Sequence, residues 1–98
     1  MKKIPPFKLI AEPLNEEAKS LRKFKWASPE VGHRHQLGGD PSFIQAERIP
    51  QCGKCGAQMT FYGQLDSISP EYCLADVGMI YVFVCFDCFT TQSFLQSG

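Results

Sequence analysis

The chain has 98 residues, which is enough for one compact domain and little more. Ten basic residues balance ten acidic ones, so the formal net charge is zero and no global field favours a nucleic-acid or membrane partner. No apolar run reaches the length of a membrane span, and residues 1–7, although basic, are interrupted by prolines, unlike a signal peptide. We therefore expect a cytoplasmic protein without a membrane segment. In a reducing cytosol, paired cysteines are expected to be metal ligands rather than disulfides.

The charge is distributed unevenly along the chain. Residues 1–48 carry nine Lys or Arg against six Asp or Glu, whereas residues 49–98 carry only Lys54 against four acidic residues. Zinc modules that bind nucleic acid usually show the opposite balance, because phosphate contacts dominate their affinity. The acidic second half, which contains every cysteine of the chain, therefore argues against a nucleic-acid partner.

The pattern of residues 1–30 predicts an extended lead-in followed by a short helix. Prolines discourage helix over residues 1–13, whereas Asn15 is a suitable N-cap for a helix over residues 15–25. Lys19, Arg22 and Lys23 place positive charge in this helix. That basic group is either a docking patch for an acidic partner or a solvated face that complements the helix dipole, and the second role is the commoner one.

Residues 31–98 begin with a turn motif, Leu37-Gly38-Gly39-Asp40-Pro41. Consecutive glycines permit positive φ or a close backbone approach, and the proline fixes the exit of the turn. We expect this turn to direct Phe43 and Ile44 into the core. An anion-binding nest of glycine amides is the alternative, but the motif lacks the lysine and the helix of a phosphate loop.

Residues 59–95 show the pattern of an antiparallel sheet. Residues 59–66 alternate, so Met59, Phe61 and Leu65 are expected to face the core, with Asp66 in solvent like the acids of the following loop. The unbroken apolar run 79–84 predicts a central strand covered on both faces, and residues 90–95 predict a third strand. The fold class is therefore mostly β (α+β): an antiparallel, zinc-ribbon-like sheet of about three strands with a short N-terminal helix. We expect a single domain over residues 1–98, in which residues 1–30 are the lead-in and helix, and residues 31–98 the turn and ribbon core.

Two CxxC turns carry the strongest chemical signal: Cys52-Gly53-Lys54-Cys55 and Cys85-Phe86-Asp87-Cys88. Each turn presents two thiolates, and two such turns complete the closed tetrahedral site that structural zinc prefers. We therefore predict one structural Zn²⁺ held by Cys52, Cys55, Cys85 and Cys88, with no open coordination position. A redox dithiol would need a low-pKa thiol in a thioredoxin-like βαβ context, which this pattern does not show.

A second metal site could be formed by His33, His35 and Cys73. Three protein ligands and a water would make a catalytic zinc, as in a metal hydrolase. The spacing is unspecific and no general-base carboxylate accompanies it, so we expect the protein not to be an enzyme. Cys73 is then a small, partly buried apolar side chain.

Four sequence blocks in this order, residues 37–45, 52–56, 59–66 and 78–85, resemble the bacterial YwqG-like family. They also resemble, more distantly, the core of the eukaryotic programmed cell death 2 family. The resemblance covers residues 31–98, and Phe43 stands where tryptophan is common in the family. It implies a binding or chaperone-like role without established enzymatic activity. Some bacterial relatives lie beside toxin genes, which implies an immunity role.

We therefore predict a small cytoplasmic zinc protein that acts as a protein–protein interaction module, with an immunity or chaperone-like role as a sub-case. The expected contact surface combines strand residues with the basic helix, namely Tyr62, Gln64, Tyr81, Lys19, Arg22 and Lys23. Two alternatives are a zinc ribbon that binds single-stranded nucleic acid through Lys54 and the helix lysines, and the metal hydrolase described above. The sequence names neither the protein partner nor the oligomeric state.

Overall fold

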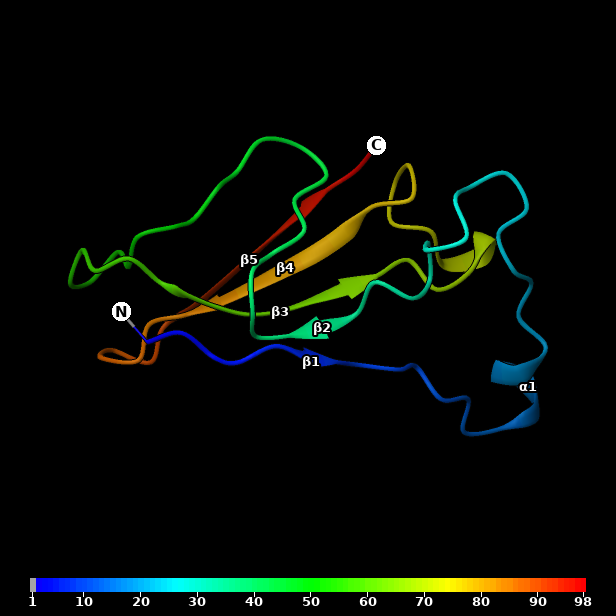
Figure 1. Ribbon diagram of the computed structural model, residues 1–98, viewed down its shortest axis with the longest axis horizontal. Coiled ribbons are helices and arrows are strands. Elements are labelled where there is room, and N and C mark those ends of the chain that lie inside the picture. The colour runs from blue at the N-terminus through cyan, green and yellow to red at the C-terminus, as the bar shows by residue number, and fades with distance from the viewer. Residues whose placement is uncertain (1) are drawn as a thin grey trace.

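The computed structural model describes residues 2–98 and contains one antiparallel sheet of five strands in the order β1-β2-β3-β4-β5. The strands are β1 (Phe7–Lys8), β2 (Gln36–Leu37), β3 (Thr60–Asp66), β4 (Met79–Val84) and β5 (Thr91–Gln96). They lie side by side in Figure 1, with the helix α1 (Glu16–Lys19) beyond one end of the sheet. The prediction of a mostly β fold is confirmed, but the number of strands is five rather than three. The two extra strands have two residues each, too few to produce an alternating pattern.

The helix is also much shorter than predicted. Asn15 caps it as expected, because its Oδ1 accepts a hydrogen bond of 2.8 Å from the backbone N–H of Ala18. The helix ends at Lys19, however, and contains no buried residue. A helix gains most of its stability in a protein from packing an apolar face. With so little to pack against, a helix over residues 15–25 does not form.

The core lies on one face of the sheet, which we call the front face. Tyr81 and Phe83 of β4 are fully buried there, and both pack on Phe94 of β5 with ring centroids 5.6 Å apart. Met59 and Met79 complete this buried layer. The apolar run of β4 therefore supplies its core residues from alternate positions only.

A β-bulge at Tyr62 changes which side chains of β3 face the core. Phe61 pairs with Phe83 whereas Gly63 pairs with Val82, so Tyr62 is an extra residue in the ladder. A bulge of this kind reverses the facing of every later residue in the strand. Leu65 consequently points outward and is 49% exposed, although alternation predicted it to face the core.

Asp66 is buried for the same reason, and the prediction of a solvated acid is wrong. Its side chain has no exposed surface and forms a bidentate ion pair with Arg34, with Nη2–Oδ1 and Nε–Oδ2 distances of 2.6 and 2.9 Å. Its Oδ2 also accepts a hydrogen bond of 2.7 Å from the backbone N–H of Gly32. The segment before β2 is thereby tied to the end of β3.

The Leu-Gly-Gly turn places the loop that follows it against the front face. Gly38 and Gly39 adopt φ angles of +65° and +68°, and a side chain at Gly38 would collide with the backbone of Pro5. The Tyr81 hydroxyl then donates a hydrogen bond of 2.8 Å to the Ser42 carbonyl, and the Phe43 ring lies 5.1 Å from the Tyr81 ring. The expectation that this turn directs Phe43 and Ile44 into the core is confirmed, since both are partly buried against it.

The opposite face of the sheet, which we call the back face, has no comparable cover. Ile80, Val82 and Val84 of β4 are only half-buried, so the prediction of a strand covered on both faces is wrong. The difference arises because the loop over residues 42–49 packs on the front face, where Phe43, Ile44 and Ile49 contact the core. Within residues 2–98, no helix has the length and apolarity required to cross a bilayer.

Candidate metal centre

Two turns of the same shape hold the four cysteines. In the first turn, the Gly56 N–H donates to the Cys52 carbonyl at 2.8 Å, and in the second, the Phe89 N–H donates to the Cys85 carbonyl at 2.7 Å. The cysteine that opens each turn also donates its N–H to a carbonyl five residues later, at Ala57 and Thr90. The two turns therefore share one backbone scheme, although their sequences differ.

Each turn closes with a residue in the left-handed conformation, which is a glycine in the first turn and a phenylalanine in the second. Gly56 has a φ of +75°, which costs glycine little, whereas Phe89 adopts a φ of +57° with a bulky side chain. The second turn lacks the glycines of the first, yet it adopts the same conformation. Phe89 is thus a strained position next to the candidate metal ligands.

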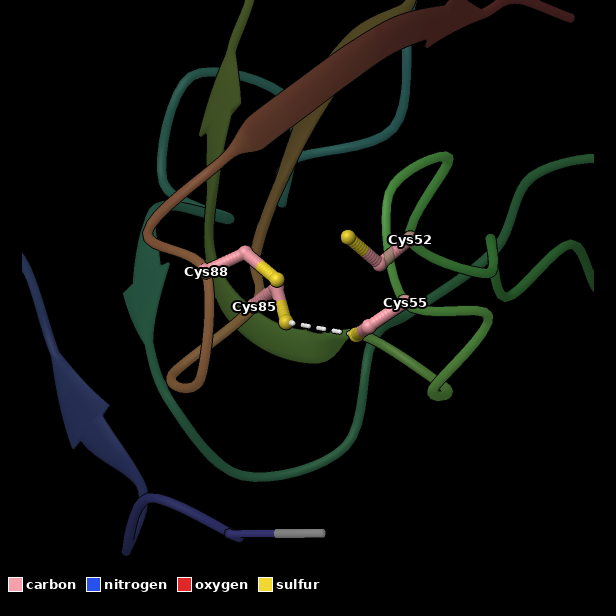
Figure 2. A group of neighbouring side chains, drawn as sticks. All are labelled: Cys52, Cys55, Cys85 and Cys88. Atoms are coloured by element: carbon pink, nitrogen blue, oxygen red, sulfur yellow. Dashed lines mark hydrogen bonds between the residues drawn. The ribbon is translucent and has the colours of Figure 1, made fainter.

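The four sulfur atoms converge on one small volume at the end of the sheet. All four ligand atoms lie within 4.8 Å of one another, and the Cys55 and Cys85 sulfurs are 3.7 Å apart. Figure 2 shows the four side chains pointing toward one another from the two turns. Tetrahedral zinc with Zn–S bonds of about 2.3 Å would place sulfurs about 3.8 Å apart. The donor set and the spacing therefore fit a closed four-cysteine site for a metal ion.

The ionisation of these thiols is strongly interdependent. A hydrogen bond of 3.1 Å between Cys52 Sγ and Thr90 Oγ1, together with backbone N–H groups including that of Lys54, lowers the pKa of Cys52 to about 6. The pKa of Cys88 rises to about 12, first because of its hydrogen bond with Cys55 and then because of burial and the neighbouring sulfurs. Deprotonation of Cys52 is therefore favoured, whereas deprotonation of Cys88 beside it is disfavoured. A bound cation would remove this opposition by neutralising the charge.

Thr90 is a site residue that sequence reasoning missed. It was predicted only as the start of the third strand, but it contacts Cys52 of the opposite turn through its hydroxyl. Its only sequence signal is its place directly after the second turn, equivalent to Ala57 after the first. Partners of this kind orient metal ligands and adjust their basicity.

The structure does not assemble the second metal site considered from the sequence. Among residues 2–98, the four cysteines are the only group of three or more His, Cys, Asp or Glu side chains placed to share an ion. His35 Nδ1 accepts a hydrogen bond of 3.0 Å from the Asp66 N–H, whereas the Cys73 sulfur bonds within its own loop to Ala75 and Val77. His33 is exposed. His33, His35 and Cys73 therefore do not form the metal site on which the hydrolase alternative depends.

The predicted contact surface is only partly exposed. Tyr62 is exposed at the bulge, but Gln64 and Tyr81 are buried beneath the loop that contains Ser42, so neither can face a partner. In the predicted basic helix, Lys19 pairs with Glu16 at 3.3 Å and Arg22 pairs with Glu71 at 2.9 Å. Arg22 and Lys23 also lie beyond the end of α1.

Comparison with known proteins gives one partial likeness. The chain is 39% identical over 64 residues to the Salmonella typhimurium protein YpfL, which is described as uncharacterized; the match covers 62% of this chain and 14% of that protein. The chain thus corresponds to a small part of that relative's length. No family model and no solved structure matches it. The comparisons therefore show a likeness to YpfL without assigning a family or an activity.

Proposed function

We propose that the chain is a protein–protein interaction module that uses one structural zinc ion to hold its fold. The four thiols support this because they form a closed donor set, and two of them, Cys52 and Cys85, belong to the buried core. A metal in such a site supports the fold and has no vacant position for a substrate. The expected compartment is the reducing cytoplasm, where the thiols are available to the metal.

The observation that carries the proposal is the number of large apolar side chains on the surface of a small domain. Leu14 is 94% exposed, and the other large apolar side chains on the surface are Phe7, Leu9, Ile10, Trp26, Tyr62, Leu65, Ile68, Tyr72, Phe89 and Leu95. Single exposed apolar residues are normal, but contiguous groups of them mark interaction surfaces. The basic residues contribute less, because Lys19 and Arg22 already have acidic partners within the chain.

The resemblance to the YwqG-like family agrees with a binding role, and an immunity or chaperone-like activity would be one form of it. The nucleic-acid alternative has no comparable support, since Lys54 is the only basic residue in the half that contains the cysteines. Fluorescence anisotropy with labelled single-stranded DNA and RNA at low salt tests that alternative. We expect no binding, because phosphate contacts would require a basic groove.

The first experiment is a measurement of metal content and free thiols on protein purified without added metal. We expect one zinc per chain and one readily reactive thiol, that of Cys73, because the other four cysteines would be ligands. Two zinc ions would favour an additional site. Disulfides in place of zinc would contradict the proposed structural role of the metal.

The interaction role is tested with zinc-loaded protein as an immobilised bait. Proteins that an excess of the free module displaces are specific partners, and binding through apolar contacts should persist when salt is raised, since salt screens exposed charge pairs. A partner that is lost at moderate salt would contradict apolar contacts. The absence of any displaceable protein, including the module itself, would contradict the proposed function.

A further inference from the structure

The last strand, β5, has a row of backbone groups that pair with no other strand. The Cys85 N–H donates to the Thr90 carbonyl at 2.9 Å, directly before β5, so these two residues form a hydrogen-bonded position of the antiparallel ladder. Such positions alternate with positions whose N–H and C=O groups point away from the neighbouring strand. Pairing with β4 is continuous, so the groups of Thr91, Ser93 and Leu95 point to the outer edge. We call these three the outer residues of β5. All three are exposed, and among residues 2–98 the strand pairs with β4 alone.

This outer edge also lacks the features that normally prevent an edge strand from pairing. β5 has six residues, none of them charged and none a proline, and its pairing with β4 contains no bulge. The opposite edge of the sheet differs, since β1 has two residues, follows Pro5 and Pro6, and contains Lys8. Edge strands are usually protected by shortness, proline, lysine or a bulge. One edge of this sheet is therefore protected against strand addition, and the other is open to it.

We propose that the outer edge of β5 binds an extended segment of a partner protein, which adds to the sheet as a further strand. This proposal rests on the interaction-module function and names its surface and the kind of partner. A row of backbone N–H and C=O groups is matched by another extended backbone, so the chemistry of the edge specifies the partner's conformation. A helix satisfies its own backbone groups and could not pair with this edge.

Arg48 gives the edge a preference for an acidic segment. Its guanidinium lies over the Phe94 ring of β5, 4.4 Å from the ring centroid. Arg48 is exposed, and it belongs to none of the ion pairs formed within residues 2–98. A strand added about 4.8 Å beyond β5 would place a side chain beside Phe94 on the same face. A carboxylate there would meet the Arg48 charge, whereas a second copy of β5 would bring none, because that strand contains no acid.

Amide hydrogen exchange of the zinc-loaded protein, followed by NMR, tests this geometry. In the free protein, the N–H groups of the outer residues should exchange much faster than those of Gln92 and Phe94, which point toward β4. The probe is a short synthetic peptide in which valine and glutamate alternate. In excess, it should slow the exchange of the outer N–H groups by about tenfold or more, because they become hydrogen-bonded.

Ser93→Pro removes one outward N–H and keeps the bonds to β4, since proline is tolerated where the N–H of an edge strand faces solvent. It should weaken peptide binding by about tenfold, because a hydrogen bond is lost and the ring obstructs the added strand. Ser93→Ala is the matched control, because it keeps the N–H, and it should bind as wild type does. Arg48→Met should reduce the preference for this peptide over one in which valine and lysine alternate.

Zinc content and near-ultraviolet circular dichroism establish that each variant keeps its core. Outer N–H groups that the peptide never protects would overturn the proposal, and so would binding that Ser93→Pro leaves unchanged. Self-association in sedimentation velocity that Ser93→Pro abolishes would assign the edge to a second copy and overturn the acidic partner. The failure of this site and the failure of the module function can be distinguished. A Ser93→Pro bait that captures the same displaceable proteins as wild type would refute only the site.

Discussion

Arg34 and Asp66 form a bidentate ion pair that joins two segments 32 residues apart. The Arg34 guanidinium also donates a hydrogen bond of 2.8 Å to the Val77 carbonyl, and its backbone N–H donates to Asp66 Oδ2 at 3.0 Å. The pair therefore connects the segment before β2, the end of β3 and the loop before β4. Asp66 is the last residue of β3, whereas Cys85 directly follows the last residue of β4, which runs antiparallel to β3, so the ion pair and the cysteine cluster lie at opposite ends of the sheet.

Asp66→Asn should lower the free energy of unfolding by about 3 kcal/mol, because it leaves the Arg34 guanidinium partly buried without a counter-charge. Urea unfolding of the zinc-loaded protein measures this loss. Asp76→Asn is the control, since Asp76 lies exposed in the neighbouring loop, and it should change the stability little. Equal effects of the two substitutions would contradict a structural role for the ion pair.

The contribution of Asp66 should depend on pH in a defined direction. Burial raises the pKa of Asp66, but hydrogen bonds from Arg34 and from the Gly32 amide outweigh it, so the pKa lies below its ordinary value. The folded state therefore binds the proton less tightly than the unfolded state, whose pKa is about 3.9. The stability that Asp66 provides is present above that pH and is lost as the pH falls through the folded pKa. The difference in unfolding free energy between wild type and Asp66→Asn should thus stay constant from pH 8 down to about pH 5, and a difference that narrows near neutral pH would contradict this assignment.

The sequence predicts local features of this protein better than long-range ones. The two cysteine turns and the strand over residues 79–84 follow from spacing and apolarity within a few residues. The bulge at Tyr62 does not, because alternation gives no sign of an inserted residue, and it alone turns Leu65 outward and Asp66 inward. Likewise, the burial of Gln64 depends on Ser42, whose backbone N–H donates to its Oε1 at 3.0 Å across a long separation in sequence.

Thr90→Val should weaken zinc binding by about tenfold, as is typical when the hydrogen-bond partner of a metal ligand is removed. The hydroxyl stabilises the Cys52 thiolate, so its loss raises the cost of deprotonating that ligand. Competition with a chromogenic zinc chelator at pH 7 measures the change. Thr91→Val is the matched control, because it makes the same substitution at the exposed neighbouring position. Identical zinc affinities for wild type and Thr90→Val would show that this hydrogen bond does not contribute.

Phe89→Gly should stabilise the zinc-loaded protein by about 0.5–1 kcal/mol, since the penalty of a left-handed conformation that glycine removes exceeds the cost of its greater freedom in the unfolded chain. Phe89 is exposed, so little packing is lost with its ring. Thermal unfolding should therefore show a higher midpoint. Asp87→Gly, in the same turn but without a positive φ, should instead lower the midpoint, because glycine there only adds freedom to the unfolded chain. A lower midpoint for Phe89→Gly would mean that the ring packs against something that outweighs the strain.

Removal of the metal should unfold residues 50–98. Cys52 and Cys85 belong to the buried core, and each opens one of the two cysteine turns. Loss of the metal leaves neighbouring sulfurs that disfavour one another's deprotonation, with no cation to neutralise them. Structural zinc contributes on the order of 10 kcal/mol in small sites, as much as the whole stability of a typical domain of this size. Treatment with a chelator under reducing conditions should therefore abolish the near-ultraviolet circular dichroism of the packed aromatic side chains and the cooperative thermal transition, and added zinc should restore both. A chelated, reduced protein that keeps its cooperative transition would show that the aromatic core of β4 and β5 holds the sheet without the metal.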